Sequence, residues 1–396
     1  MISELQIYFI MFVLFIVTYK FDITDDKVLT FFSFPSIFIL YYSLCNFYDY
    51  QNYIHYNLFY ISYKSYLTVI ILLISYVLGF FVPYALKVKS RVGNKENSYY
   101  GYSIKKLNLC ILITFIISLL ALLANLSNVG FNLSALFEDA RDYEKSFGDN
   151  WLINYMYFLH VPSMILIVFK TTLVNKVRVF DVFLFIMLLF FSLFHGIKFT
   201  VFDALFFPLC YYIALKGFSR TAKFYFLSII LIFVAFFASF SFFVRGGGGD
   251  FNLLAILDYL VPNYVNLFYS IEKSELLFAY PFDLYIGGLT SFINLPRELP
   301  QVLFLVNDKY NMITGFVYIV AGYFYVFSFL FFTSMIYLYI YFSKKRTLSS
   351  VFICGYILFS ILMMCYAYYF GTKYKYIYFV LVLYVIDVFC RTRRVN

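Results

Sequence analysis

The sequence predicts an all-α polytopic membrane protein with about 11 (10–12) transmembrane helices and two larger extracytoplasmic loops that carry amphipathic helices. Of its 396 residues, 63% are hydrophobic and only 13% are charged, whereas soluble proteins are roughly 45–50% apolar and about 25% charged. The apolar residues fall in runs of about 17–25, the length that crosses a bilayer core of roughly 30 Å. Spanning barrels instead alternate apolar and polar residues in short segments.

The apolar runs divide the chain into eleven predicted spans within a single integral membrane domain, residues 1–396. The first run lacks a basic leading region and a small-residue cleavage site, so we expect a retained span and not a signal peptide. No internal repeat suggests an inverted-repeat transporter. The predicted spans are 5–19, 29–47, 66–86, 107–126, 151–169, 180–195, 199–215, 224–244, 312–342, 349–370 and 376–390.

The charges of the loops predict the orientation of the chain. The formal net charge is +9, and cytoplasmic loops are the ones that carry an excess of Lys and Arg. This places the N-terminus outside and the C-terminus in the cytoplasm, although the mixed charges of loop 20–28 leave the first turn ambiguous. Because the basic residues fall in short loops between spans, they give no reason to expect nucleic acid as a partner. The basic segments are 87–106, 170–179, 216–223, 343–348 and the tail from Arg391.

Two larger loops fall on the outer side in this arrangement. Outer loop 1, residues 127–150, has five acids and two bases, and its apolar residues from Leu133 to Ala140 have helical spacing, which predicts an amphipathic helix. The large outer loop, residues 245–311, has seven acids, four bases and half of the chain's eight prolines. We expect it to form a lid over a polar site, hinged at Gly246–Gly249.

Cations on the outer side are the informative ones, because the charge pattern predicts few of them there. A cation near the membrane is costly unless it is paired or lies in a wet cavity, and clustered Arg and Lys suit a phosphate group. Each also has a structural interpretation, such as reaching the lipid headgroups or pairing on a solvated helix face. The candidates near a span end or an amphipathic helix are Arg141, Lys198, Arg245, Arg297 and Lys309.

Acid–base candidates are fewer. His195 could act as a general base because its ordinary pKa is near neutrality, although a lone His at a span end also fits a structural role; Asp142 and Asp250 are alternatives. Asp203 and Asp387 lie within predicted spans, near their ends. The six cysteines lie in or beside apolar runs without metal or disulfide spacing, so we expect no metal and no cofactor.

The order of spans and loops resembles the Wzy-type oligosaccharide repeat-unit polymerases, the family of O-antigen and capsule polymerases. Where the family often has Asp-Phe-Gly after the late loop, this chain has Ala321-Gly322-Tyr323, which removes the acid. The resemblance is carried by Phe34-Pro35-Ser36, Arg141, the turn Gly196–Lys198, Arg245 directly after a span, and Asn311-Met-Ile-Thr314.

The resemblance implies a glycosyltransferase of the bacterial cytoplasmic (inner) membrane that joins undecaprenyl-pyrophosphate-linked oligosaccharides on the outer face. The lipid pyrophosphate is the activated donor, and a chain-length regulator and a flippase are implied as partners beside the bilayer. Arg141, Lys198 and Arg245 match the family residue by residue, and with His195 they are the expected catalytic residues. The expected substrate-binding residues are Arg297, Asn311, Thr314, Asp142 and Asp250.

Three alternatives stay open. An O-antigen-type ligase shares the outer-loop architecture and would transfer a finished glycan to another acceptor. A polysaccharide or lipid-linked oligosaccharide transporter (flippase) predicts charges at span centres, repeated halves and small outer loops. A structural or sensor protein would have no need for outer cations that face one cavity.

Overall fold

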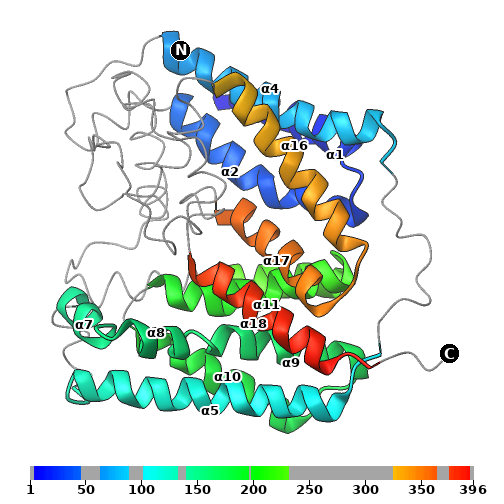
Figure 1. Ribbon diagram of the computed structural model, residues 1–396. Coiled ribbons are helices and arrows are strands. Elements are labelled where there is room, and N and C mark those ends of the chain that lie inside the picture. The colour runs from blue at the N-terminus through cyan, green and yellow to red at the C-terminus, as the bar shows by residue number, and fades with distance from the viewer. Residues whose placement is uncertain are drawn as a thin grey trace. The chain divides into compact units, whose positions relative to one another are not determined.

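All the elements in the described part of this computed structural model are helices (Figure 1). The structure describes residues 4–45, 63–88, 101–132, 140–195, 198–231, 324–363 and 374–392, of which 220–231 are also helical. The elements are α1 (Glu4–Phe21), the 3-10 helix η1 (Asp25–Lys27), α2 (Val28–Cys45), α4 (Tyr63–Ala85), α5 (Ile104–Asn128), α7 (Ala140–Phe147), α8 (Trp151–Tyr157), α9 (His160–Val174), α10 (Val179–Leu193), α11 (Lys198–Lys216), α16 (Phe324–Ser343), α17 (Leu348–Met363) and α18 (Tyr374–Cys390).

These helices belong to two compact units. Unit 1 comprises Met1–Gly93, Asn252–Lys344 and Ile357–Tyr374, and unit 2 comprises Asn94–Phe251, Lys345–Tyr356 and Lys375–Asn396. Unit 1 therefore contains α1, α2, α4 and α16, whereas unit 2 contains α5, α7 to α11 and α18. The first half of α17 belongs to unit 2 and its second half to unit 1.

In unit 1, the turn between α1 and α2 is built around Asp22, which is 1% exposed. Its carboxylate accepts hydrogen bonds from the backbone N–H and the hydroxyl of Thr24, at 2.9 and 2.6 Å, and from both groups of Thr30, at 2.9 Å each. The contact with Thr30 satisfies a backbone N–H at the start of α2 that has no partner inside the helix. Asp22 therefore caps α2 from the end of α1.

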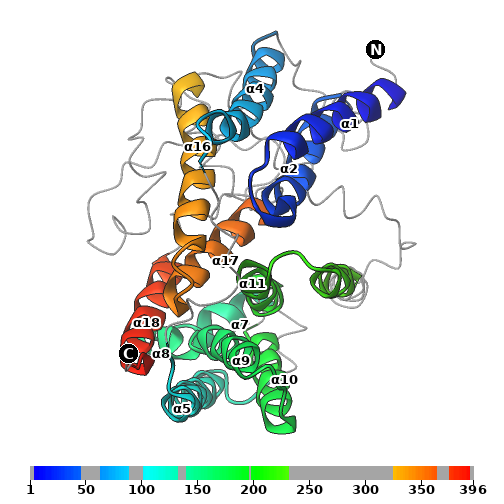
Figure 2. The same ribbon diagram turned by 90° about the vertical axis from the view of Figure 1, so that its right-hand side faces the viewer.

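In unit 2, α5, α9, α10 and α11 pack side by side, and Figure 2 looks along their axes. Ser163 on α9 donates a hydrogen bond to Thr114 on α5 in the buried interface. The first half of α17 lies close to α11, since a Cβ added to Gly355 would come within 3.0 Å of the Tyr211 backbone. Small residues permit such close contacts between helices.

Two helical stretches, Ile104–Asn128 and Trp151–Val174, are long and apolar enough to cross a membrane by length and composition. Five shorter apolar helices occur among the described residues. The outward faces of α5 and α10 are also apolar, a feature that marks contact with lipid or with another protein. The exposed residues on these faces include Leu112, Ile116, Leu123, Phe183, Ile186 and Phe190.

The described helices confirm the all-α fold class, and most of their ends lie within a few residues of the predicted spans. The fifth predicted span differs, because the helix breaks at Phe158 and Leu159 into α8 and α9. Pro162 has no N–H to donate to the Phe158 carbonyl, which instead accepts from Val161 at 3.2 Å. Lys170, expected in a loop, is buried inside α9, which continues to Val174.

Several predictions fall outside the described residues. They include 133–139 of outer loop 1, with most of its predicted amphipathic helix, and the whole of 245–311, with the Gly246–Gly249 hinge and the lid. The start of the ninth predicted span lies outside them as well. The number of membrane spans therefore stays a prediction.

Candidate functional site

The starts of α7, α11 and α18 lie at one end of unit 2, together with the turn at Phe194 and His195 that follows α10; we call this the α7 end. The Tyr143 hydroxyl on α7 donates a hydrogen bond to the Phe194 carbonyl at 3.0 Å. Arg141 is the second residue of α7 and Lys198 is the first residue of α11. The structure thus brings together the backbone positions of two predicted cations that are 57 residues apart (198 − 141).

His195 is buried in the turn between α10 and α11, with 3% of its surface exposed. Its ring contacts those of Phe147, Tyr157 and Phe158, with centroid separations of 5.3, 5.6 and 5.5 Å. Neither ring nitrogen has a hydrogen-bond partner within the described part of the chain. A neutral imidazole has one N–H donor and one acceptor nitrogen, so among the described residues both hydrogen-bonding functions of this buried ring are unused.

A buried ion pair lies at the same end. Lys375, in the first turn of α18, pairs with the carboxylate of Asp203 in the second turn of α11. Asp203 also accepts a hydrogen bond from the Tyr376 hydroxyl at 3.0 Å. The side chains of Lys375 and Asp203 are 17% and 3% exposed. The Lys375 ammonium lies 5.3 Å from the ring centroid of Phe158, so the Phe158 ring contacts both Lys375 and His195.

Three helices at the α7 end carry a cation in their first two positions: Arg141 in α7, Lys198 in α11 and Lys375 in α18. A helix N-terminus has a partial positive charge that favours acids and opposes cations, by typically 0.3–1 kcal/mol each. α11 and α18 have no acid in their first turn, while α7 has Asp142. Backbone N–H groups and cations at one place are the components of an anion-binding site.

At the opposite end of unit 2, which we call the Asp387 end, an acid and not a cation lies at the start of a helix. Asp181 lies in the first turn of α10, where the helix dipole favours an acid. It pairs with Lys170 near the end of α9, and Lys170 also donates to the Asn108 side chain at 3.0 Å. The side chains of Lys170 and Asp181 are 8% and 2% exposed. This buried ion pair can be compared with the pair of Lys375 and Asp203 at the α7 end.

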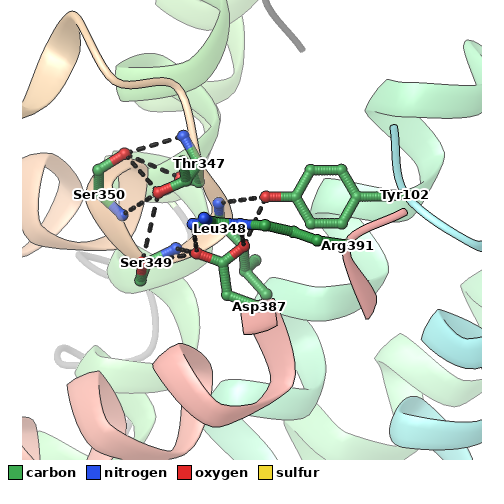
Figure 3. Close-up of polar contacts among 7 residues, drawn as sticks. All are labelled: Tyr102, Thr347, Leu348, Ser349, Ser350, Asp387 and Arg391. Carbon is green, nitrogen blue, oxygen red and sulfur yellow. Dashed lines mark hydrogen bonds and ion pairs between the residues drawn. The ribbon is translucent and has the colours of Figure 1, made fainter. Parts of the chain in front are cut away.

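A hydrogen-bond network around Asp387 joins three segments at the same end (Figure 3). Asp387 on α18 is fully buried. It accepts from the Tyr102 hydroxyl at 2.6 Å, from the Ser349 hydroxyl at 2.7 Å, and from Nε and Nη2 of Arg391 at 3.0 and 2.7 Å. Both carboxylate oxygens are satisfied, so this network ties α17 and α18 to the segment before α5 and has a structural role.

The other predicted site residues have different outcomes. Asp142 is exposed and forms a surface ion pair with Lys145 at 3.1 Å, with side chains 73% and 77% exposed. Arg245, Asp250, Arg297, Asn311 and Thr314 lie outside the described residues. Lys309, the weakest of the outer cations, lies outside them too.

Lys375 is absent from the predicted outer cations, although a signal for it exists in the sequence. Alternation of the loops places the short segment 371–375, between the last two predicted spans, on the outer side with Lys373 and Lys375. Asp203 appears in the sequence only as an acid near a span end. Its pairing with a residue 172 positions later is visible only in the folded chain.

Among the described residues, no group of three or more His, Cys, Asp or Glu side chains could hold a metal ion. No protein-family model, no curated protein and no solved structure matches this chain. The chemistry of the α7 end therefore carries the functional argument.

Proposed function

We propose that this chain polymerises undecaprenyl-pyrophosphate-linked oligosaccharide repeat units into a surface polysaccharide on the outer face of the bacterial cytoplasmic membrane. One observation carries the proposal: three helices start at the α7 end of unit 2 with a cation, against the helix dipole. An anionic ligand at that end would offset this cost. The pyrophosphate of a lipid-linked donor is such a ligand.

The proposal places the chain in the bilayer as a multi-pass protein with about 11 spans. The apolar outward faces of α5 and α10 support contact with lipid. The loop charges assign the Asp387 end to the cytoplasm, because the segment before α5 and the chain after α18 are rich in Lys and Arg. The α7 end then faces outward, where repeat units arrive after they have been flipped.

The reaction is a group transfer between two lipid-linked glycans. The acceptor hydroxyl oxygen at the nonreducing end of one unit forms a bond to the anomeric carbon of the growing glycan. The bond from that carbon to the pyrophosphate oxygen breaks, and the lipid pyrophosphate leaves with the electron pair. Cations at the α7 end stabilise the charge that develops on it. The hydroxyl proton passes to a base, for which His195 is the buried candidate.

A deletion in the native host tests the proposal. Loss of long chains with single repeat units retained supports a polymerase, and unchanged chain lengths refute it. Finished lipid-linked polymer that is never transferred indicates a ligase. Loss of all surface glycan with intracellular accumulation of lipid-linked units indicates a flippase.

Complementation with point variants then tests the site. Arg141→Ala and Lys198→Ala should fail to restore long chains. Lys145→Ala is the matched control, because Lys145 lies on α7 like Arg141 and its side chain is 77% exposed. Restoration of full chain length by both site variants would remove the α7 end from the mechanism.

A further inference from the structure

We propose that Lys375 binds the diphosphate group of the lipid-linked substrate and that Asp203 holds the Lys375 ammonium in place until the substrate arrives. This inference rests on the proposed function, because that function supplies the diphosphate. It adds a binding residue from the last helix of the chain, outside the segments that carry the family resemblance.

The position of Lys375 is unusual for a structural cation. It occupies the second position of α18, where the helix dipole opposes a positive charge. The ammonium lies 5.3 Å from the ring centroid of Phe158 and 5.1 Å from that of Tyr376, and aromatic faces at this range stabilise and orient a cation. With 17% of its side chain exposed, Lys375 can be reached from the surface of unit 2.

Asp203 is suited to a holding role. Its carboxylate is almost fully buried and is shared between the Lys375 ammonium and the Tyr376 hydroxyl. A buried carboxylate without a cation is costly, so Asp203 keeps Lys375 at the α7 end. A diphosphate carries more negative charge than one carboxylate, and the ammonium has three N–H donors. A bound diphosphate can therefore share the ammonium with Asp203 or displace it.

The pair formed by Lys170 and Asp181 shows what a structural ion pair looks like in the same unit. Asp181 lies in the first turn of α10, where the helix dipole favours an acid, and Lys170 lies inside α9 before its last turn, where the dipole does not oppose it. Lys170 is buried deeper than Lys375 and has a second partner in Asn108. Of these two described pairs, the one at the α7 end has a cation opposed by its helix dipole and a side chain that is partly exposed.

Calorimetric titration of the purified full-length protein in lipid nanodiscs tests the inference, with farnesyl diphosphate, farnesyl monophosphate and inorganic diphosphate as probes. The wild-type protein should bind farnesyl diphosphate more tightly than either of the others. Equal or tighter binding of inorganic diphosphate would overturn the lipid-linked assignment. The double variant Lys375→Met with Asp203→Asn removes both charges of this pair together, and it should bind farnesyl diphosphate at least about tenfold more weakly.

Two further variants separate binding from a structural role. Asp203→Asn alone removes the anion that competes for Lys375, so it should bind farnesyl diphosphate more tightly than the wild type. Lys170→Met with Asp181→Asn is the matched control and should leave the affinity unchanged. The inference is overturned if Asp203→Asn weakens binding as much as the double variant does, or if the double variant binds like the wild type.

The outcome for this inference can be separated from that for the proposed function. Lys375-dependent binding of farnesyl diphosphate by a protein whose deletion leaves long chains intact would keep the site and reject the polymerase. Full-length polysaccharide made by a Lys375→Met strain, together with loss of polymer in the deletion strain, would keep the polymerase and reject the site.

Discussion

Replacing Asp387 by Ala should destabilise the protein strongly, because one carboxylate joins three segments at the Asp387 end. The carboxylate is fully buried. It is the common acceptor for the Tyr102 hydroxyl, the Ser349 hydroxyl and the Arg391 guanidinium. Its removal leaves these donors without their acceptor, and it disconnects α18 from α17 and from the segment before α5.

The magnitude follows from the kind of contact that is lost. Breaking a buried ion pair by removing one partner costs about 3–5 kcal/mol. The Arg391 side chain is 32% exposed, so water can solvate part of the guanidinium after the change, and the lower end, about 3 kcal/mol, applies. Tyr102→Phe removes the hydrogen bond to this charged acceptor and the one that the hydroxyl accepts from the Leu348 backbone N–H at 3.1 Å, and it should cost about 1.5–3 kcal/mol.

The assay is the free energy of unfolding in mixed micelles, measured by titration with sodium dodecyl sulfate and followed by circular dichroism. Asp142→Ala is the control, because its carboxylate is 73% exposed and pairs with Lys145 on the surface; it should change stability by less than about 0.5 kcal/mol. A loss below about 1 kcal/mol for Asp387→Ala would refute the structural role of the network.

Three other predictions concern single positions. Burial raises the pKa of Asp22, and the hydrogen bonds to its carboxylate offset this only in part. The folded state therefore takes up a proton before the unfolded state does, so stability should rise as the pH falls through the folded pKa toward about 3.9; Asp22→Asn should remove this dependence in unfolding titrations at several pH values. Gly355→Ala should cost about 1–3 kcal/mol of unfolding free energy, because the new methyl group would lie 3.0 Å from the Tyr211 backbone, and a neutral result would mean that these helices can separate. His195→Phe should keep the aromatic packing and change stability by less than about 1.5 kcal/mol. It should still lower polymer synthesis by at least about 100-fold if His195 is the base, and wild-type synthesis would show that its role is packing alone.

Composition and the length of the apolar runs are enough to predict the all-α class, since backbone groups in an apolar solvent must be satisfied within each segment. The ends of the apolar runs also predict helix boundaries, and α5 and α10 begin and end within a few residues of the predicted spans. Charge alternation also predicts Arg141 and Lys198 as outer cations, because the rule depends only on the order of loops along the chain.

Other features depend on contacts between residues far apart in the sequence, and only the tertiary structure decides them. Lys375 and Asp203 pair across 172 positions, and no local pattern in either helix encodes that distance. The aromatic surroundings of His195 combine rings from α7, from α8 and from the turn that follows α8. Local physics thus determines which segments are helices and on which side their loops are expected. Packing determines which charges become buried together, because the cost of an unpaired charge depends on what surrounds it in the folded chain.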